Sequence, residues 1–292
     1  MSIIVHMPAV STPFTREKLL QIARSLPADL QVLSSLGEML QDINSELDEI
    51  AKLLRRDFAL AARIVRISNS PVFGGGGQIA SIEEAVNRVG FGEIIKLVGT
   101  ATAARFTERS LEHYNISAQK LRDNMLFGAF ACEALARSAG RDARVAYMAG
   151  LLRPLGLMVL DRAARGHLHW TERYAPDRWR TYSAWEGNIF GFDNCEVTAL
   201  ILEEWRFPTE LSAALRRHYL TRVGDSDDPL ACLLNVAGGL THQAGRGLPG
   251  DADCWDLSDT RLQAAGVTAE DVEAATTTAK EAFDAALTAL AI

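Results

Sequence analysis

The sequence contains few cysteines and no long apolar run. Its cysteines, at positions 132, 195, 232 and 254, lie far apart and form no Cys-x-x-Cys pair. This distribution excludes a zinc framework of paired thiolates and a disulfide scaffold, and it suits a reducing cytoplasm. No stretch of about 18 uninterrupted apolar residues occurs, which argues against a membrane span. The N-terminus has neither a basic start nor an apolar core, so no secretory signal peptide is predicted.

Excess positive charge is also lacking. The net charge of −7 provides no general attraction to nucleic acid or to an anionic membrane, so neither is an expected partner. The arginines between positions 55 and 66 could form a local basic face, but solvated helix arginines are the favoured interpretation. His167 and His169 could form a two-ligand clip, although surface histidines in an aromatic loop are the favoured interpretation.

Motifs for phosphate binding and for serine nucleophiles are missing. The glycine run 74–77 lacks the following Lys of a P-loop, and a helix rather than a strand precedes it, so a plain turn is favoured. No Gly-x-Ser-x-Gly elbow supports a serine hydrolase.

Helical periodicity dominates what is present. Apolar residues recur at three- and four-residue spacing along most of the chain, with almost no period-two alternation, which predicts an all-α fold. The caps agree with this pattern: Ser117 precedes a helix to residue 139, Asp142 begins the next helix, Pro154 breaks it, and Asp228 precedes Pro229. Further helices are predicted over 16–25, 28–41, 45–56, 57–69, 81–90, 91–107, 196–205, 209–220 and 228–245, with two more closing the chain.

The stretch from Asp57 to Gly90 has the most distinctive local pattern. A helix runs from Asp57, and Pro71 ends it. Asn69 lies where an amide can bond the backbone groups that the helix end leaves unpaired. Ser81 and Glu84 predict a capping box, and Gly90 predicts a left-handed C-cap.

This stretch resembles the signature of the HDOD family, the HD-related output domains of bacteria. The matching elements are Asp57-Phe-Ala-Leu60, Asn69-Ser70, the glycine loop, Ser81-Ile82, Ala85-Val86 and Val89-Gly90. Only the Pro of the first element and the Leu of the last are replaced. The resemblance implies structural roles for Asp57, Asn69, Ser70, Ser81 and Gly90. It also implies an N-terminal bundle of about six helices packed on a degenerate HD-like helical bundle.

The second half resembles the same family and, through it, the HD phosphohydrolases, which hold metal ions with His and Asp ligands. At the positions matching those ligands this chain has Asn124, Arg153, Pro154 and Asn194, and only His218 is kept from a His pair. An arginine would repel a metal ion and a proline has no donor atom. The resemblance therefore implies a vestigial site with no metal, no cofactor and no catalytic residues.

The resemblance covers about two thirds of the chain and gives its predicted organisation. We expect an arm with a short helix, an HDOD domain in two helical parts, and a C-terminal helical extension without a usable motif. The corresponding ranges are 1–25, 26–225 (26–108 and 116–225) and 226–292.

The function that this resemblance implies is regulatory. We expect a cytoplasmic, non-catalytic adaptor of bacterial signal transduction that acts through contacts with an unidentified signalling protein. One alternative is a pseudoenzyme that binds a small anion or nucleotide in the vestigial pocket through Arg153. A less favoured alternative is a metal-dependent phosphohydrolase with relocated ligands.

A tract rich in aromatic residues borders the vestigial site. Five aromatic side chains fall between positions 170 and 185 (Trp170, Tyr174, Trp179, Tyr182 and Trp185). Because Arg and Trp often anchor interfaces, Arg153, Trp179 and Trp185 are candidate interface residues. The alternative is that the aromatic side chains fold inward and cap the bundle.

Overall fold

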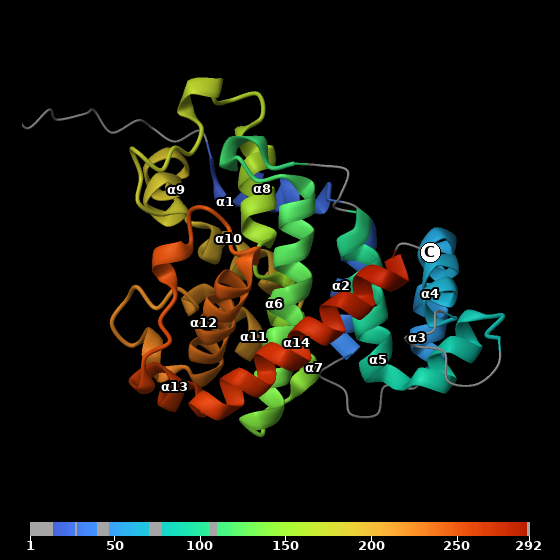
Figure 1. Ribbon diagram of the computed structural model, residues 1–292. Coiled ribbons are helices and arrows are strands. Elements are labelled where there is room, and N and C mark those ends of the chain that lie inside the picture. The colour runs from blue at the N-terminus through green and yellow to red at the C-terminus, as the bar shows by residue number, and fades with distance from the viewer. Residues whose placement is uncertain (1–13, 27, 40–46, 70–77, 106–109, 291–292) are drawn as a thin grey trace, which may run out of the picture.

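Fourteen α-helices account for most of the chain that the computed structural model describes, residues 14–26, 28–39, 47–69, 78–105 and 110–290 (Figure 1). No strand occurs among these residues, apart from an isolated bridge between Leu111 and Ile116. The all-α prediction is confirmed. The helices are α1 (Arg16–Arg24), α2 (Ala28–Met39), α3 (Leu47–Leu54), α4 (Phe58–Ser68), α5 (Ile82–Arg105), α6 (Ala118–Ser138), α7 (Ala143–Leu152), α8 (Leu155–Ala164), α9 (Tyr182–Phe190), α10 (Asn194–Glu204), α11 (Thr209–Arg217), α12 (Pro229–Thr241), α13 (Asp259–Ala265) and α14 (Ala269–Leu290).

The turn between α4 and α5 is held by Asn69. Its Nδ2 donates to the carbonyl oxygens of Val65 (3.0 Å) and Ile79 (2.8 Å), and its Oδ1 accepts from the backbone N–H of Ile79 (2.8 Å). These bonds satisfy backbone groups at the end of α4, as the sequence predicts. Ser70 and the glycine run 74–77 lie outside the described residues.

The start of α5 follows its predicted caps, with one difference. The Ser81 hydroxyl accepts from the backbone N–H of Glu84 (3.1 Å). The Glu84 carboxylate accepts from Ala80 (2.9 Å) instead of from Ser81, so the reciprocal contact is shifted by one residue.

The prediction of a left-handed C-cap at Gly90 is wrong. Gly90 has φ 79° and ψ 170°, a conformation essentially restricted to glycine, and it kinks α5 between two helical segments. The chain therefore continues as helix beyond the kink to Arg105.

Helices α6 and α7 form the centre of the C-terminal part. They pack closely because both carry glycine at the crossing, where a Cβ on Gly150 would lie 2.6 Å from the carbonyl oxygen of Gly128. Ser117 caps α6, Asp142 caps α7, and Pro154 separates α7 from α8, all as predicted. The segment Ala143–Ala164 is long and apolar enough to cross a membrane. However, 83% of its most apolar 18-residue stretch is buried inside the structure, which favours a pair of core helices.

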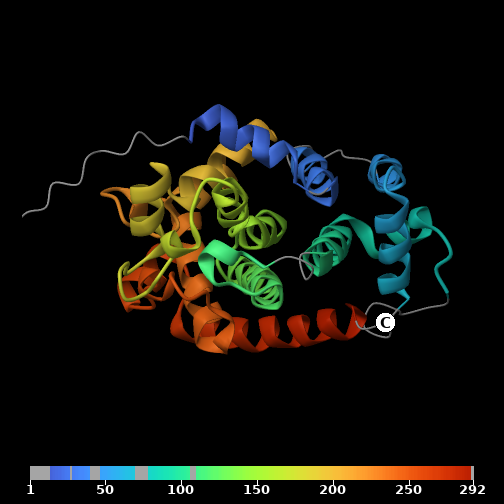
Figure 2. The same ribbon diagram turned by 90° about the horizontal axis from the view of Figure 1, so that it is seen from above.

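Two helices from the ends of the chain connect its parts. Helix α14 runs along α6 and reaches α5, as Figure 2 shows along one side of the molecule. Helix α1 packs on α8 and α10 rather than only on its neighbours in sequence. Helix α12, in the predicted C-terminal extension, is buried along almost its whole length and packs on α6, α11 and α13.

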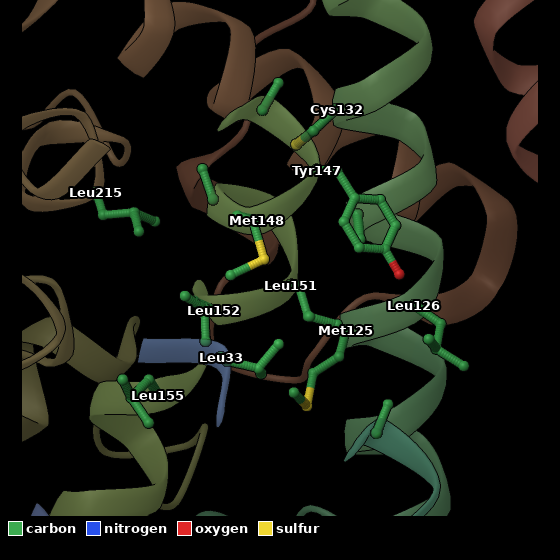
Figure 3. Close-up of a cluster of buried hydrophobic side chains, with 14 of the residues drawn as sticks. Leu33, Met125, Leu126, Cys132, Tyr147, Met148, Leu151, Leu152, Leu155 and Leu215 are labelled. Atoms are coloured by element: carbon green, nitrogen blue, oxygen red, sulfur yellow. The ribbon is translucent and has the colours of Figure 1, made fainter. Parts of the chain in front are cut away.

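The hydrophobic core is continuous between the two predicted parts of the HDOD domain. Figure 3 shows Leu33 of α2 lying among Met125 of α6 and Leu151 and Leu152 of α7. All four side chains are at most 2% exposed. The N-terminal helices therefore pack directly on the helices that carry the vestigial site.

Candidate functional site

Four of the five vestigial positions lie at or next to helix ends in the C-terminal part, and Asn124 lies within a helix. Asn124 is within α6, Arg153 ends α7, Pro154 precedes α8, Asn194 begins α10 and His218 ends α11. All except Pro154 are polar or charged and at most 4% exposed. The structure brings Arg153, Asn124 and His218 into one polar cluster and places Asn194 in a second one.

The guanidinium of Arg153 is the centre of the first cluster. Its Nη1 lies 3.1 Å from Oδ2 of Asp251, and its Nη2 donates to Oδ1 of Asn124. The ring of Trp255 lies 5.1 Å from the guanidinium carbon. Asn124 is itself held by donating to the carbonyl oxygen of Arg246 (2.8 Å). A buried charge needs such paired groups, and here an aspartate, an amide and an aromatic face supply them.

Asp251 comes from a loop in the predicted C-terminal extension. It is fully buried, and burial raises the pKa of its carboxyl while the guanidinium of Arg153 opposes that rise. Among the described residues, its Oδ1 and the indole Nε1 of Trp255 make no hydrogen bond of ordinary geometry, although the indole is near enough to lower the pKa of the carboxyl.

His218 is a buried, neutral imidazole. Its Nδ1 lies 2.7 Å from the carbonyl oxygen of Leu215, and because a carbonyl only accepts, Nδ1 carries the proton. Burial and the nearby charge of Arg153 lower the pKa of His218 to about 3. Its Nε2 therefore presents a lone pair, and within the described part of the chain neither this atom nor the hydroxyl of the adjacent Tyr219 has a hydrogen-bond partner.

These residues do not fit a resident metal ion. A metal site of the HD type needs several imidazole or carboxylate ligands, whereas the cluster has a guanidinium at its centre. The Oδ1 of Asn124 and the Oδ2 of Asp251 both bond that guanidinium. Within the described residues, no group of three or more His, Cys, Asp and Glu side chains is close enough to hold a metal.

Asn194 belongs to a second buried cluster, centred on Glu186 of α9. The Oε2 of Glu186 accepts from the backbone N–H (2.7 Å) and the Nδ2 (2.8 Å) of Asn194, and its Oε1 accepts from the hydroxyl of Tyr114 (2.7 Å). Glu186 is fully buried, and this burial raises its pKa to about 8. The asparagine at this vestigial position joins α9 to the start of α10.

The two clusters are connected through the tight contact of α8 with α10. The hydroxyl of Thr198 accepts from the backbone N–H of Gly156 (2.9 Å) and lies 3.4 Å from the carbonyl oxygen of Arg153. A Cβ on Gly156 would overlap the carbonyl oxygen of Asn194. Glycine at this position therefore permits the approach that sets Arg153 beside α10.

Sequence reasoning missed Asp251, Trp255 and Glu186. Asp251 and Trp255 lie in a Gly/Asp/Pro-rich stretch without periodicity, and Glu186 lies in the aromatic tract, where nothing distinguishes it from a solvated glutamate. A Trp four residues after an Asp is a weak pattern. It indicates a site only when the loop is known to lie beside Arg153.

The proposal of an interface at Arg153 and Trp185 needs correction, because both side chains are inside the molecule. Trp185 is 1% exposed, donates from Nε1 to the carbonyl oxygen of Glu172 (3.1 Å) and packs edge-on against Tyr114. Tyr174 and Tyr182 are buried with it, whereas Trp179 is partly buried against the core. Most of the tract caps the bundle, because its aromatic faces pack on one another. The side chain of Trp170 lies outside the described part.

Known proteins share this architecture. The family model of the HDOD domain matches residues 26–221. An HDOD domain protein of Geobacter sulfurreducens, of unknown function, has a TM-score of 0.63 at 19% identity, covering 94% of this chain and 98% of its own. A signal transduction protein, so named provisionally, from Marinobacter aquaeolei VT8 has a TM-score of 0.63 at 16% identity, covering 94% of this chain and 65% of its own.

Two further relatives complete the comparison. A provisionally named phosphohydrolase of Shewanella amazonensis SB2B has a TM-score of 0.61 at 19% identity, covering 92% of this chain and 97% of its own. An uncharacterized protein of Treponema pallidum (strain Nichols) is 23% identical over 189 residues, which are 64% of this chain and 36% of that protein. This chain thus spans about a third of the curated relative. The solved structures share the fold, and the match over residues 26–221 shows that the chain belongs to the HDOD domain family.

Proposed function

We propose that this chain is a non-catalytic regulatory or adaptor module of bacterial signal transduction that acts in the cytoplasm through protein–protein contacts. The observation that carries the proposal is the position of Arg153. Its guanidinium, paired with Asp251 and Asn124, lies where the resemblance to HD phosphohydrolases places the metal-binding doublet.

The chemistry of the cluster supports the lack of catalysis. A divalent ion placed beside the guanidinium would meet a like charge in a site of low dielectric constant, where repulsion is strong. The carboxylate that could ligate the ion is already paired with Arg153. The neutral His218 leaves one lone pair, which by itself does not make a metal centre.

The names of the relatives supply two competing hypotheses. The Marinobacter protein is named for signal transduction and the Shewanella protein for phosphohydrolysis. At 16% and 19% identity these names do not choose between the hypotheses for this chain. The residues of the site favour the first, since they provide no set of metal ligands among the described side chains.

The test combines elemental analysis with a hydrolysis assay. The purified chain is analysed for bound divalent metal and assayed on bis(4-nitrophenyl) phosphate and 4-nitrophenyl phosphate with Mn²⁺, Mg²⁺ or Zn²⁺. We expect substoichiometric metal and no chelator-sensitive turnover, with the same result for His218→Ala. About one metal per chain, with turnover that both a chelator and His218→Ala abolish, would contradict the proposal.

The adaptor role itself is tested by partner capture. The chain is immobilised, proteins from its native host are retained, and each retained protein is produced separately and tested for direct binding. We expect at least one signalling protein to bind the purified chain directly. Failure of every retained protein to bind directly would count against the adaptor role.

A further inference from the structure

The loop that carries Asp251 and Trp255 enters the vestigial site from outside the family match, which ends at residue 221. Asn235 of α12 fixes this loop by donating from Nδ2 to the carbonyl oxygens of His218 (2.9 Å) and Cys254 (2.8 Å). Its Oδ1 accepts from the backbone N–H of Asp256 (3.0 Å). The loop is therefore attached to the same helix end that carries His218.

We propose that residues 250–256 are a built-in plug of the vestigial site, in which Asp251 takes the place of an oxyanion, and that phosphate binds Arg153 when the plug is displaced. The regulatory use of such a plug rests on the non-catalytic function proposed above. The binding of phosphate to the opened site does not.

An oxyanion fits the groups that the plug covers. The planar guanidinium of Arg153 matches the geometry of carboxylate and phosphate equally, and a carboxylate already occupies it. The hydroxyl of Tyr219, which has no hydrogen-bond partner among the described residues, is a further donor in the cluster. The second acidic side chain of the loop, Asp253, is exposed and pairs with Arg180 instead.

The plug is an incomplete occupant of the site. Among the described residues, two polar atoms beneath the plug have no hydrogen-bond partner, Nε2 of His218 and the hydroxyl of Tyr219, whereas Nε1 of Trp255 and Oδ1 of Asp251 belong to the plug and lie near each other. Buried polar groups are normally paired, so two such atoms beside one buried ion pair are unusual for a purely structural contact. A hydrogen phosphate ion has acceptor oxygens for the guanidinium and for the hydroxyl of Tyr219, and its own O–H can donate to the lone pair on Nε2 of His218.

Part of the loop lies on the surface of the molecule. Pro249, Ala252 and Asp253 are exposed, so the loop runs along the surface and only Gly250 and Asp251 turn fully inward. Besides the bonds of Asn235, the loop is joined to α9 by the backbone N–H of Tyr182, which donates to the carbonyl oxygen of Gly250 (2.9 Å). Opening therefore has to break these hydrogen bonds, the ion pairs of Asp251 and Asp253, and the ring contacts of Trp255 with His218 and Tyr219.

The test compares the unmodified whole chain with the variants Asp251→Ala and Asp251→Asn and with the control variant Arg153→Leu/Asp251→Ala. Thermal unfolding of each protein is measured in sodium chloride and in inorganic phosphate at equal ionic strength. Removal of the carboxylate leaves a buried guanidinium unpaired, so we expect the Tm of Asp251→Ala to fall by about 6–20 °C. At about a hundredfold excess over its Kd, phosphate should raise the Tm of this variant saturably by about 5 °C or more.

The unmodified chain and the control variant should respond little to phosphate. In the unmodified chain Asp251 competes from within the molecule at high effective concentration. In the control variant the guanidinium is absent. A parallel series with adenosine monophosphate distinguishes a free phosphate from a phosphate ester, because only a site that accepts the ester will be stabilised by both.

The outcomes decide the proposal in each case. A variant lacking Asp251 that is unfolded in chloride and folds in phosphate supports it, as does a saturable Tm increase that depends on Arg153. The proposal is overturned if Asp251→Ala and Asp251→Asn each melt at the same temperature in chloride and in phosphate. A phosphate effect of the same size in the control variant also overturns it. Variants that stay unfolded in both salts also count against it. None of these results depends on the hydrolysis assay, so failure of the plug is distinguishable from failure of the proposed function.

Discussion

Arg153 and Asp251 form a buried ion pair, with 3.1 Å between Nη1 and Oδ2 and side chains that are 4% and 1% exposed. The two residues are 98 positions apart and lie on opposite sides of the C-terminal limit of the family match. The pair therefore makes the C-terminal segment part of the vestigial site.

The first prediction concerns the coupling within this pair. Replacing Arg153 with Met leaves the Asp251 carboxyl buried without its partner, which should lower the free energy of unfolding by about 3–5 kcal/mol. Arg153→Met/Asp251→Asn removes both charges and should recover most of the loss. Urea unfolding of the two single variants and the double variant measures the coupling, and strictly additive losses would show that the pair is not coupled.

A second prediction concerns the pH dependence of Glu186. Burial raises its pKa from an ordinary 4.5 to about 8, so between these values the folded state binds more protons than the unfolded state. The free energy of unfolding should therefore fall as the pH rises through this window, by at most about 1.4 kcal/mol per pH unit, and level off above it.

Comparison with Glu186→Gln isolates this effect. The amide keeps an oxygen that can accept from Asn194 and cannot ionise, so the variant should lack the contribution of Glu186. The range from about pH 7 to 9 is the most informative, because the unfolded-state histidines are mostly neutral there. Equal pH slopes for the two proteins in urea unfolding would refute the assignment.

A third prediction tests the contact between α8 and α10. A methyl on Gly156 would overlap the carbonyl oxygen of Asn194, so Gly156→Ala should destabilise the fold by about 1–3 kcal/mol or more. Gly187→Ala is the matched control, because no atom of the described residues lies within 4 Å of a Cβ at that helical position. The control should be neutral or stabilised by up to about 1 kcal/mol. Equal melting temperatures of the two variants would mean that α8 and α10 move apart to accommodate the added methyl without loss of stability.

The fourth prediction concerns Asn69. Asn69→Ala removes its bonds to Val65 and Ile79, and because the side chain is itself exposed we expect a loss of about 1 kcal/mol. Asn69→Asp keeps the acceptor for the N–H of Ile79 and loses both donors, so it should be intermediate. An unchanged melt for Asn69→Ala would instead suggest a role in surface contacts.

Local sequence signals determined the helices and most of their caps. Ser117, Asp142, Pro154 and Asp228 act through neighbours two to four residues away, so their roles can be read from the chain alone. Gly90 shows the limit of this reasoning. Its positive φ is foreseeable from glycine, but whether the chain then ends a helix or kinks within one depends on what the next segment packs against.

The substitutions at the vestigial positions are likewise visible in the sequence, because they concern residue identity. The structural consequences of these substitutions cannot be read from the sequence. Whether Arg153 faces solvent, an anion or a carboxylate depends on a loop 98 residues away. No pattern in the intervening sequence indicates that this loop and Arg153 come together. In the same way, only packing decides that Trp185 lies in the core, since an aromatic side chain suits an interface and an interior equally well. Burial and long-range pairing thus come from the tertiary structure, because the free energy of a buried charge depends on groups that the fold brings together.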